Sequence, residues 1–239
     1  YIISKIHTYH NQKTKEKVNN LVEPIKIDVK EEVTKKEETK TQEKTETQKE
    51  NEEVKEITYT KDFKNLKKIN SEFVAWLTVP DTSISYPVVK HKDNDYYLNH
   101  SFDKSYNIGG WIFMDYRNST DFTDQNTIIY GHDSYSTTMF GTLKNILNKN
   151  WYTKNKTITL ETDSKKITAE IISIYTVNNT NDYIQVVFSE KEFEEFLDKI
   201  VSRSIYNFQN KPTSNDKIIT LSTCYKDSKK RLVLHAKIK

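Results

Sequence analysis

Cys224 is the only cysteine among the 239 residues of the chain. A single thiol excludes an internal disulfide and any metal site built from several cysteines. A cysteine used as core filler normally lies inside an apolar run, whereas Cys224 ends the run KIITLSTC and meets the polar loop YKDSKK. A rigid sheet can present a nucleophile at the end of a strand, so we interpret Cys224 as a candidate nucleophile. A buried structural thiol is the alternative.

Arg231 begins the next apolar run, RLVLHAKI, in a chain that has 34 Lys and only three Arg, at positions 117, 203 and 231. Such a preference for Lys suggests that Arg is kept where its planar guanidinium matters. If 217–224 and 231–238 pair as an antiparallel hairpin, Cys224 and Arg231 face each other with Cβ atoms about 5 Å apart. The cation then stabilises a thiolate or a developing oxyanion. A surface arginine at a loop end is the alternative.

A cysteine nucleophile also needs a proton carrier, which is usually histidine. His132 ends the apolar run TIIYGH, so it lies at a strand terminus as Cys224 does. The other histidines lie in the N-terminal tail, in polar loops or inside the last strand, namely His7, His10, His91, His100 and His235. For His235 we expect a structural, hydrogen-bonded role. His132 is therefore the candidate base.

Short β-branched and aromatic runs separated by turn residues predict strands within 83–89, 109–115, 126–133, 157–161 and 166–177, followed by the hairpin 217–238. A short helix is expected within 137–148. The spacing of apolar residues from Phe63 to Leu77 predicts an N-terminal helix that ends at VPD. A few helices among many strands indicate a β-barrel or sandwich with helices outside it.

The segment from Ser189 to Tyr206 predicts a long helix directly before the cysteine strand. Ser189 and Glu192 form the pattern of a capping box, and Phe188 and Phe193 are spaced for a hydrophobic staple. An apolar stripe that runs from Phe193 to Val201 gives the helix one face to bury.

In combination, these features resemble the sortases. The chain has TLSTC at the end of one strand, an Arg that opens RLVLHAKI, and IIYGHD about ninety residues upstream. The runs YLNH and MFGTL, with the capped helix, narrow the resemblance to class B sortases over roughly residues 60–239. The resemblance implies a mainly β fold, an eight-stranded barrel with an N-terminal helix and a long helix before the Cys-bearing strand. It also implies transpeptidation that attaches surface proteins to the cell wall of Gram-positive bacteria.

The resemblance assigns catalytic roles to three residues. Cys224 would attack the carbonyl between Thr and the following residue of a C-terminal sorting pentapeptide and form a thioester. His132 would protonate the leaving amine and deprotonate the incoming peptidoglycan amine, and Arg231 would hold the substrate and the oxyanion. The six residues between Cys224 and Arg231 make a short loop for class B, which leaves that loop's substrate contacts open.

Similarity to the family also implies a set of residues that contact the sorting peptide. These are Ser222, Thr223, Tyr183 and Ile184, with Asn99 of YLNH expected to orient His132. We expect no cofactor and no metal ion, since the acidic cluster typical of calcium-dependent class A sortases is not evident.

The N-terminal quarter differs in composition from the rest. We expect residues 1–10 to be a remnant flanking a membrane anchor, 11–56 to be a charged disordered or partly helical tether, and 57–239 to be the catalytic domain. Deleting 11–55 should then leave stability unchanged. No apolar run of 18 residues exists in the sequence. A single-pass anchor outside the given chain would place the protein, as a monomer, on the extracellular face of the cell membrane.

The residues leave several other functions open. A cysteine peptidase would use the same nucleophile and base with water as the acceptor. A cell-wall transpeptidase of the other cysteine type carries its arginine directly behind the thiol, unlike this chain. A pilin-polymerising sortase and a non-catalytic wall-binding module are further alternatives. The net formal charge of +3 is too small to indicate nucleic-acid binding.

Overall fold

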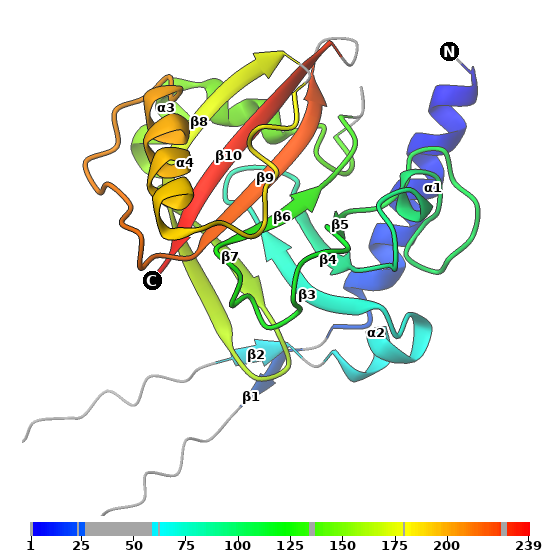
Figure 1. The fold of residues 1–239 in the computed structure, drawn as a ribbon. Coiled ribbons are helices and arrows are strands. Elements are labelled where there is room, and N and C mark those ends of the chain that lie inside the picture. The colour runs from blue at the N-terminus through cyan, green and yellow to red at the C-terminus, as the bar shows by residue number, and fades with distance from the viewer. Residues whose placement is uncertain are drawn as a thin grey trace, which may run out of the picture.

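The computed structural model describes residues 2–22, 24–26, 59–61, 63–133, 137–178, 180–225 and 229–239. Within these residues eight strands close into a barrel in the order β10-β8-β7-β3-β4-β5-β6-β9 (Figure 1). In chain order they are β3 (Phe73–Thr78), β4 (Ser85–Val89), β5 (Phe113–Met114), β6 (Asn126–Tyr130), β7 (Thr157–Glu161), β8 (Lys166–Asn178), β9 (Ile218–Tyr225) and β10 (Lys230–Ile238). The predicted fold class is confirmed.

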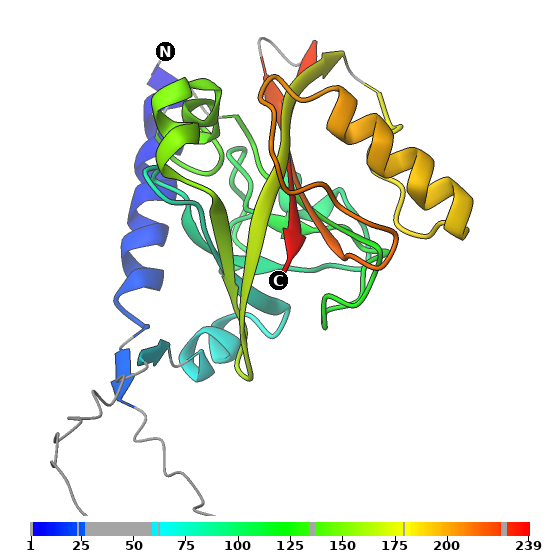
Figure 2. The ribbon, with the colours of Figure 1, turned by 90° about the vertical axis from the view of Figure 1, so that its left-hand side faces the viewer.

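The helices lie outside the barrel, and two short strands pair beside it. The helices are α1 (Ile2–Asn19), α2 (Lys64–Ile69), the 3-10 turns η1 (Tyr96–Leu98) and η2 (Leu143–Leu147), α3 (Lys149–Lys154) and α4 (Glu190–Ser202). The strands β1 (Pro24–Lys26) and β2 (Tyr59–Lys61) form a separate antiparallel pair. Figures 1 and 2 show α1 and α4 on opposite sides of the barrel.

Alternation along the last two strands divides the apolar side chains between two cores. Leu221 and Leu232 belong to the core that fills the barrel, whereas Ile218 and Val233 pack with α4 in a second, smaller core. This pattern keeps both faces of the β9–β10 hairpin buried along most of its length. The hairpin is therefore a rigid support for the residues next to its turn.

The strand order brings the three candidate catalytic residues, Cys224, Arg231 and His132, to one end of the barrel. Arg231 is paired with Cys224 in the antiparallel β9–β10 ladder, so the predicted register is confirmed. On the other side β9 runs parallel to β6, with Tyr130 opposite Ser222. Parallel neighbours end at the same edge of a sheet, so His132, two residues beyond β6, lies at the edge where Cys224 ends β9.

The predicted capped helix is present as α4. Ser189 accepts a hydrogen bond from the Glu192 amide, while the Glu192 carboxylate accepts one from the Ser189 amide. The rings of Phe188 and Phe193 lie 5.2 Å apart, as expected for a staple. The helix ends at Ser202, four residues earlier than predicted, and a hairpin-like return leads to β9.

The prediction of one helix from Phe63 to Leu77 was wrong in its second half. The helix ends at Ile69, and Phe73–Thr78 is instead β3, which pairs with both β4 and β7. Four of the six side chains of β3 are buried, and the other two are half-buried. A strand that is buried on both faces has apolar residues at every position, so it satisfies helical spacing as well as strand spacing. The barrel ladders decide between the two.

The start of the predicted tether is packed against the barrel. Asn11, Thr14 and Val18 form one buried stripe of α1, and the Lys15 ammonium lies 2.5 Å from the Ser83 carbonyl and 4.4 Å from the centre of the Tyr86 ring. This packing differs from the solvated spacer that we expected. The buried stripe is mostly polar, so it lacks the apolar pattern that predicts a packed helix. Deletion of 11–55 is therefore expected to destabilise the fold, since it would expose the surface that α1 covers. Residues 27–58 lie outside the described residues, and the rest of the domain division stays a prediction.

His235 has the structural role that we expected. Its ring is fully buried, with Nε2 2.9 Å from the Tyr175 hydroxyl and Nδ1 2.8 Å from the Thr220 hydroxyl. Burial, assisted by the nearby Arg203 cation, lowers the pKa of His235 from 6.5 to about 3. The imidazole is thus neutral in the folded protein at any pH near neutrality.

This burial makes stability depend on pH in a defined window. Between pH 6.5 and about 3 the unfolded chain protonates His235 and the folded chain does not. The free energy of unfolding should therefore fall as the pH falls through this window, by about 1.4 kcal/mol per pH unit from this residue. Denaturant unfolding at pH 6.5, 5.5 and 4.5 should show a shallower slope for His235→Gln than for the wild type. Parallel slopes would contradict the assignment.

Candidate active site

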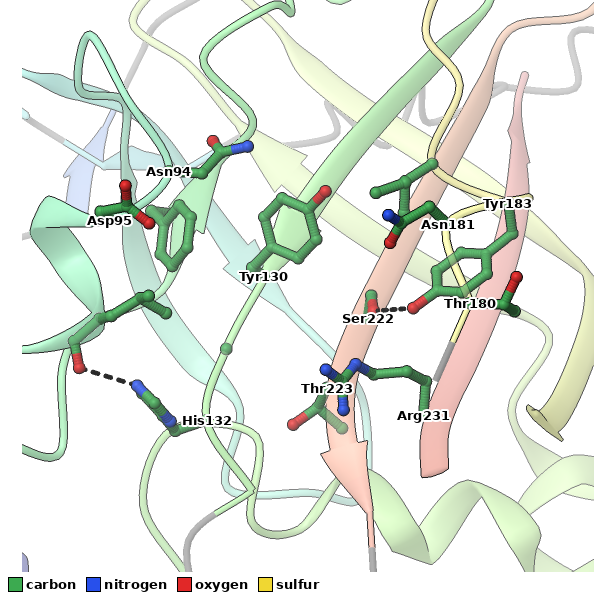
Figure 3. A pocket seen from close by; sticks show the side chains of 14 residues that line it. Asn94, Asp95, Tyr130, His132, Thr180, Asn181, Tyr183, Ser222, Thr223 and Arg231 are labelled. Carbon is green, nitrogen blue, oxygen red and sulfur yellow. Dashed lines mark hydrogen bonds between the residues drawn. The ribbon is translucent and has the colours of Figure 1, made fainter. Parts of the chain in front are cut away.

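A cavity of about 420 Å³ opens at the end of the barrel where β6 and β9 terminate (Figure 3). Its walls come from five parts of the chain: the turn around η1, β5, the end of β6, the segment between β8 and α4, and the β9–β10 hairpin. Among the residues that line it are His132, Arg231, Ser222, Thr223, Tyr183 and Ile184. The structure therefore brings together six of the residues that the sequence singled out.

His132 is held by one backbone contact. Its Nε2 lies 2.8 Å from the Leu98 carbonyl oxygen. Because a carbonyl oxygen only accepts, Nε2 donates this bond and carries the proton in the neutral ring. Nδ1 is then the nitrogen that exchanges protons. The contact thus selects one tautomer of the imidazole and orients the ring at the rim of the cavity.

Asn99 remains a predicted, not an observed, partner of the His132 ring. Its backbone carbonyl accepts a hydrogen bond from Asn107, and the preceding residue, Leu98, holds His132. Of the described residues that line the cavity, Leu98 represents the YLNH run. The YLNH run does supply a contact that orients His132, and this contact is a backbone carbonyl. Backbone carbonyls carry no sequence signal, so the sequence pointed to the amide side chain instead.

Gly110 leaves the space that the His132 ring occupies. Its φ is +55°, in the left-handed region that favours glycine. A Cβ at this position would lie 2.8 Å from Cδ2 of His132, 2.8 Å from the Leu98 carbonyl oxygen and 2.5 Å from the Tyr97 carbonyl oxygen. Those distances are too short for any carbon. Glycine is therefore required here both by the backbone and by the seat of the imidazole.

Ser222 and Tyr183 form the opposite wall. Their hydroxyls are 2.9 Å apart, and both side chains are buried (Figure 3). Arg231 extends from β10 over β9 beside Thr223. The predicted peptide-contacting residues Ser222, Thr223, Tyr183 and Ile184 thus lie on the same side of the cavity as the guanidinium.

Several lining residues had no signal in the sequence. They come from the turn that precedes η1 and from the start of the segment after β8, namely Asn94, Asp95, Thr180 and Asn181. Each is an ordinary polar residue in its local context. Only the approach of distant segments at the barrel rim gives them a role.

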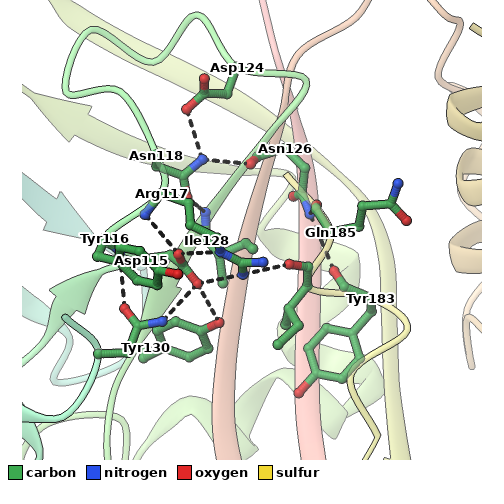
Figure 4. A network of polar contacts seen from close by, with 12 residues as sticks. Asp115, Tyr116, Arg117, Asn118, Asp124, Asn126, Ile128, Tyr130, Tyr183 and Gln185 are labelled. Carbon is green, nitrogen blue, oxygen red and sulfur yellow. Dashed lines mark hydrogen bonds and ion pairs between the residues drawn. The ribbon is translucent and has the colours of Figure 1, made fainter. Parts of the chain in front are cut away.

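A buried carboxylate lies behind the cavity (Figure 4). Asp115 is fully buried and accepts hydrogen bonds from Arg117, from the Tyr130 hydroxyl and from Asn94. Burial alone would raise the pKa of Asp115, but these hydrogen bonds, mainly those from Arg117, hold it below its usual range. Burial and the Asp115 charge raise the pKa of Tyr130 well above its usual range. The site therefore keeps this carboxylate ionised and this phenol neutral.

Comparison with known proteins agrees with the fold and with the site described above. The family profile described as the sortase domain covers residues 77–239. Together with the closed barrel and the hairpin that sets Cys224 opposite Arg231, this match shows that the chain belongs to the sortase family.

Comparison with individual relatives shows to which class of the family the chain belongs. Sortase B of Listeria monocytogenes is 39% identical over 181 residues, and Sortase B of Staphylococcus aureus is 37% identical over 180 residues; in each case the match covers 74% of both chains. The crystal structure of Clostridium perfringens sortase B superposes with a TM-score of 0.71 at 38% identity, over 74% of this chain and 100% of that one. The chain is a class B sortase, a cysteine transpeptidase that anchors surface proteins.

A structure described as a Staphylococcus aureus sortase B–substrate complex is also similar. It has a TM-score of 0.70 at 36% identity, over 74% of this chain and 84% of that one. The family profile, which spans residues 77–239, includes every residue that lines the cavity.

Proposed function

We propose that Cys224, His132 and Arg231 together carry the acyl transfer. The observation behind this is the strand arrangement: Cys224 is paired with Arg231 in one ladder, and His132 follows the strand on the other side of β9. An unperturbed cysteine has a pKa of about 8.5, so a cation next to the thiol raises the fraction of reactive thiolate. The hairpin supplies that cation at the adjacent position.

The reaction then proceeds in two halves. The Cys224 thiolate attacks the carbonyl carbon of the peptide bond between Thr and the following residue of a C-terminal sorting pentapeptide, and Arg231 stabilises the negative charge on the carbonyl oxygen. Nδ1 of His132 takes up the proton of the Cys224 thiol and passes it to the departing amine, leaving a thioester. A peptidoglycan amine next loses its proton to His132, attacks the thioester and releases Cys224. The product is a surface protein joined to the cell wall through a new amide.

The cavity accommodates the peptide on the wall that carries Ser222 and Tyr183. A volume of about 420 Å³ fits several extended residues rather than a whole folded domain. Its lining mixes apolar side chains with a few polar groups, as ligand sites usually do. We propose that Thr180, Asn181 and Asn94 contact the peptide together with the residues predicted from the sequence.

We further propose that the protein acts as a monomer on the extracellular face of the cell membrane, held by an N-terminal anchor. The charged composition of residues 11–56 supports this location, as does membership in a family that handles surface proteins. In the described part of the chain, no helix is long and apolar enough to cross a bilayer.

The proposal is tested by the products of the reaction. The protein is incubated with a small library of fluorogenic pentapeptides that contain Pro and Thr, with and without amines that resemble peptidoglycan cross-bridges, and the products are identified by mass spectrometry. A peptide–amine adduct supports transpeptidation. Hydrolysis alone with every amine would instead favour the peptidase.

Replacement of Arg231 by Lys separates charge from geometry. Lys keeps the positive charge but loses the planar pair of donors. If Arg231 binds the oxyanion or a peptide carbonyl, Arg231→Lys should lower kcat/KM for the peptide at least about tenfold. Steady-state kinetics with the best pentapeptide measure this. A near-normal kcat/KM would make Arg231 an ordinary surface residue.

A further inference from the structure

All three arginines of this lysine-rich chain lie around one segment. Residues 180–185 connect β8 to the approach of α4, and four of them line the cavity. Arg231 lines the same cavity, Arg203 binds Asp182 and Arg117 binds the Ile184 carbonyl. A chain with 34 Lys has thus placed each guanidinium at the 180–185 segment or at the pocket that this segment walls.

Arg203 holds one end of the segment. It is the residue that caps α4, and its Nη1 and Nη2 donate to the two carboxylate oxygens of Asp182 at 2.9 and 2.6 Å. Its guanidinium also lies 5.8 Å from the centre of the Tyr175 ring. Both partners are about one-third exposed, so the paired geometry matters more than the charge. Lysine offers one ammonium and cannot reproduce the two parallel bonds.

Arg117 holds the middle of the segment (Figure 4). Its Nη2 donates to the Ile184 carbonyl oxygen at 2.8 Å, while Nε and Nη2 donate to the buried Asp115 carboxylate, also at 2.8 Å. Asp115 accepts a further bond from Tyr130, which lines the cavity. The guanidinium therefore ties the segment to a carboxylate inside the barrel wall.

A third contact fixes the backbone between these points. The Asn126 amide donates to the carbonyls of Tyr183 and Gln185, at 3.2 and 2.8 Å. Its own oxygen accepts a bond from Thr220 at 2.6 Å, so the segment is joined to both β6 and β9. Three consecutive carbonyls of the segment, those of Tyr183, Ile184 and Gln185, are thus bound to side chains of the barrel.

We propose that Arg117 and Arg203 are positioning residues that hold the 180–185 segment in its peptide-binding shape before the sorting peptide arrives. Neither side chain lines the cavity. A preformed wall spares the peptide the entropy of ordering a loop, so it strengthens binding without acting on the reacting atoms. This inference rests on the proposed function, because the ligand that the wall receives is the sorting peptide.

Arg117→Lys and Arg203→Lys test this in the full chain. With a pentapeptide that the wild type processes and a saturating amine, each variant should raise KM about five- to tenfold and change kcat less than about twofold, as expected for a coupled contact. The rate of Cys224 alkylation by iodoacetamide should stay unchanged. Lys191→Gln is the matched control, since it removes an exposed ion pair with Glu195 on the same helix and should leave KM unchanged.

The two ends of the Arg203 pair give an independent check. Asp182→Asn should raise KM as Arg203→Lys does. The KM of the double variant should not exceed the higher KM of the two single variants. This pair is partly exposed, so it keeps the test available even if Arg117→Lys fails to fold. Normal KM in Arg203→Lys and Asp182→Asn, whatever their Tm, would overturn the inference. Equal losses of kcat and of the alkylation rate would overturn it as well, by showing general distortion. A wild type that processes no peptide would instead overturn the proposed function.

Discussion

Cys224→Ala should reduce transpeptidation by at least about four orders of magnitude, because removing the nucleophile from a catalytic group that acts as a unit leaves only binding and electrostatic contributions. The thioester cannot form without the thiol, so no acyl-enzyme should be seen by mass spectrometry. The variant should unfold at nearly the wild-type temperature, since Ala fits the β9 backbone and the ladder to Arg231 does not depend on the thiol.

The single cysteine gives this experiment an internal control. Because no other thiol exists, iodoacetamide can add only one group to a cysteine of the wild-type chain, and loss of activity should follow the extent of that addition. A saturating sorting peptide should slow the addition. Undiminished turnover by Cys224→Ala would refute the proposed chemistry, and active but fully alkylated protein would do the same.

Gly110→Ala should lower kcat/KM by about two orders of magnitude, since a displacement of about 1 Å in a catalytic group has an effect of that size. The added methyl group would meet both the His132 ring and the Leu98 carbonyl that orients it, at 2.8 Å each. It also forces alanine into a left-handed conformation, which costs about 1–2 kcal/mol. Kinetics and thermal unfolding together separate the two effects.

Gly109→Ala is the matched control. A Cβ there would clash with the side chain of Asn11 on α1, and the three atoms nearest to it belong to Asn11 and Asn107. We expect Gly109→Ala to lose stability through the α1 contact while the active molecules keep a near-normal kcat/KM. If both glycine variants lose activity equally, or if Gly110→Ala stays within threefold of the wild type, the seat of His132 is not what Gly110 provides.

The local elements of the second half of the chain were predictable because their signals are local. A capping box, a staple and an apolar stripe lie within one helix, and the strands β7 to β10 alternate or carry β-branched residues over short windows. The helix over 63–77 failed because β3 is buried on both faces. That this segment is a strand and not a helix becomes clear only from its ladders with β4 and β7.

The α1 helix is a second element whose burial the local sequence did not predict, in this case because its buried face is mostly polar. Asn11, Thr14 and Val18 carry too little apolar character to predict a packed face, yet all three are buried. A polar helix docks through hydrogen bonds and cation–π contacts whose partners lie far away in sequence, such as the bond between the side chains of Asn11 and Asn107. Composition therefore underestimated how much of the N-terminal segment belongs to the fold.

The sequence alone singled out the candidate nucleophile, its paired arginine and the candidate base, since each stands at or near the end of a strongly patterned strand and two of the three belong to rare residue types in this chain. The family followed from those motifs. Only the tertiary structure decided that the parallel pairing of β6 and β9 brings the histidine to the cysteine's edge of the barrel. It also decided that a backbone carbonyl and a glycine seat the imidazole, and that two more arginines hold the wall of the pocket. The physical reason is that strand order and backbone contacts join residues distant in sequence, and no local pattern records them.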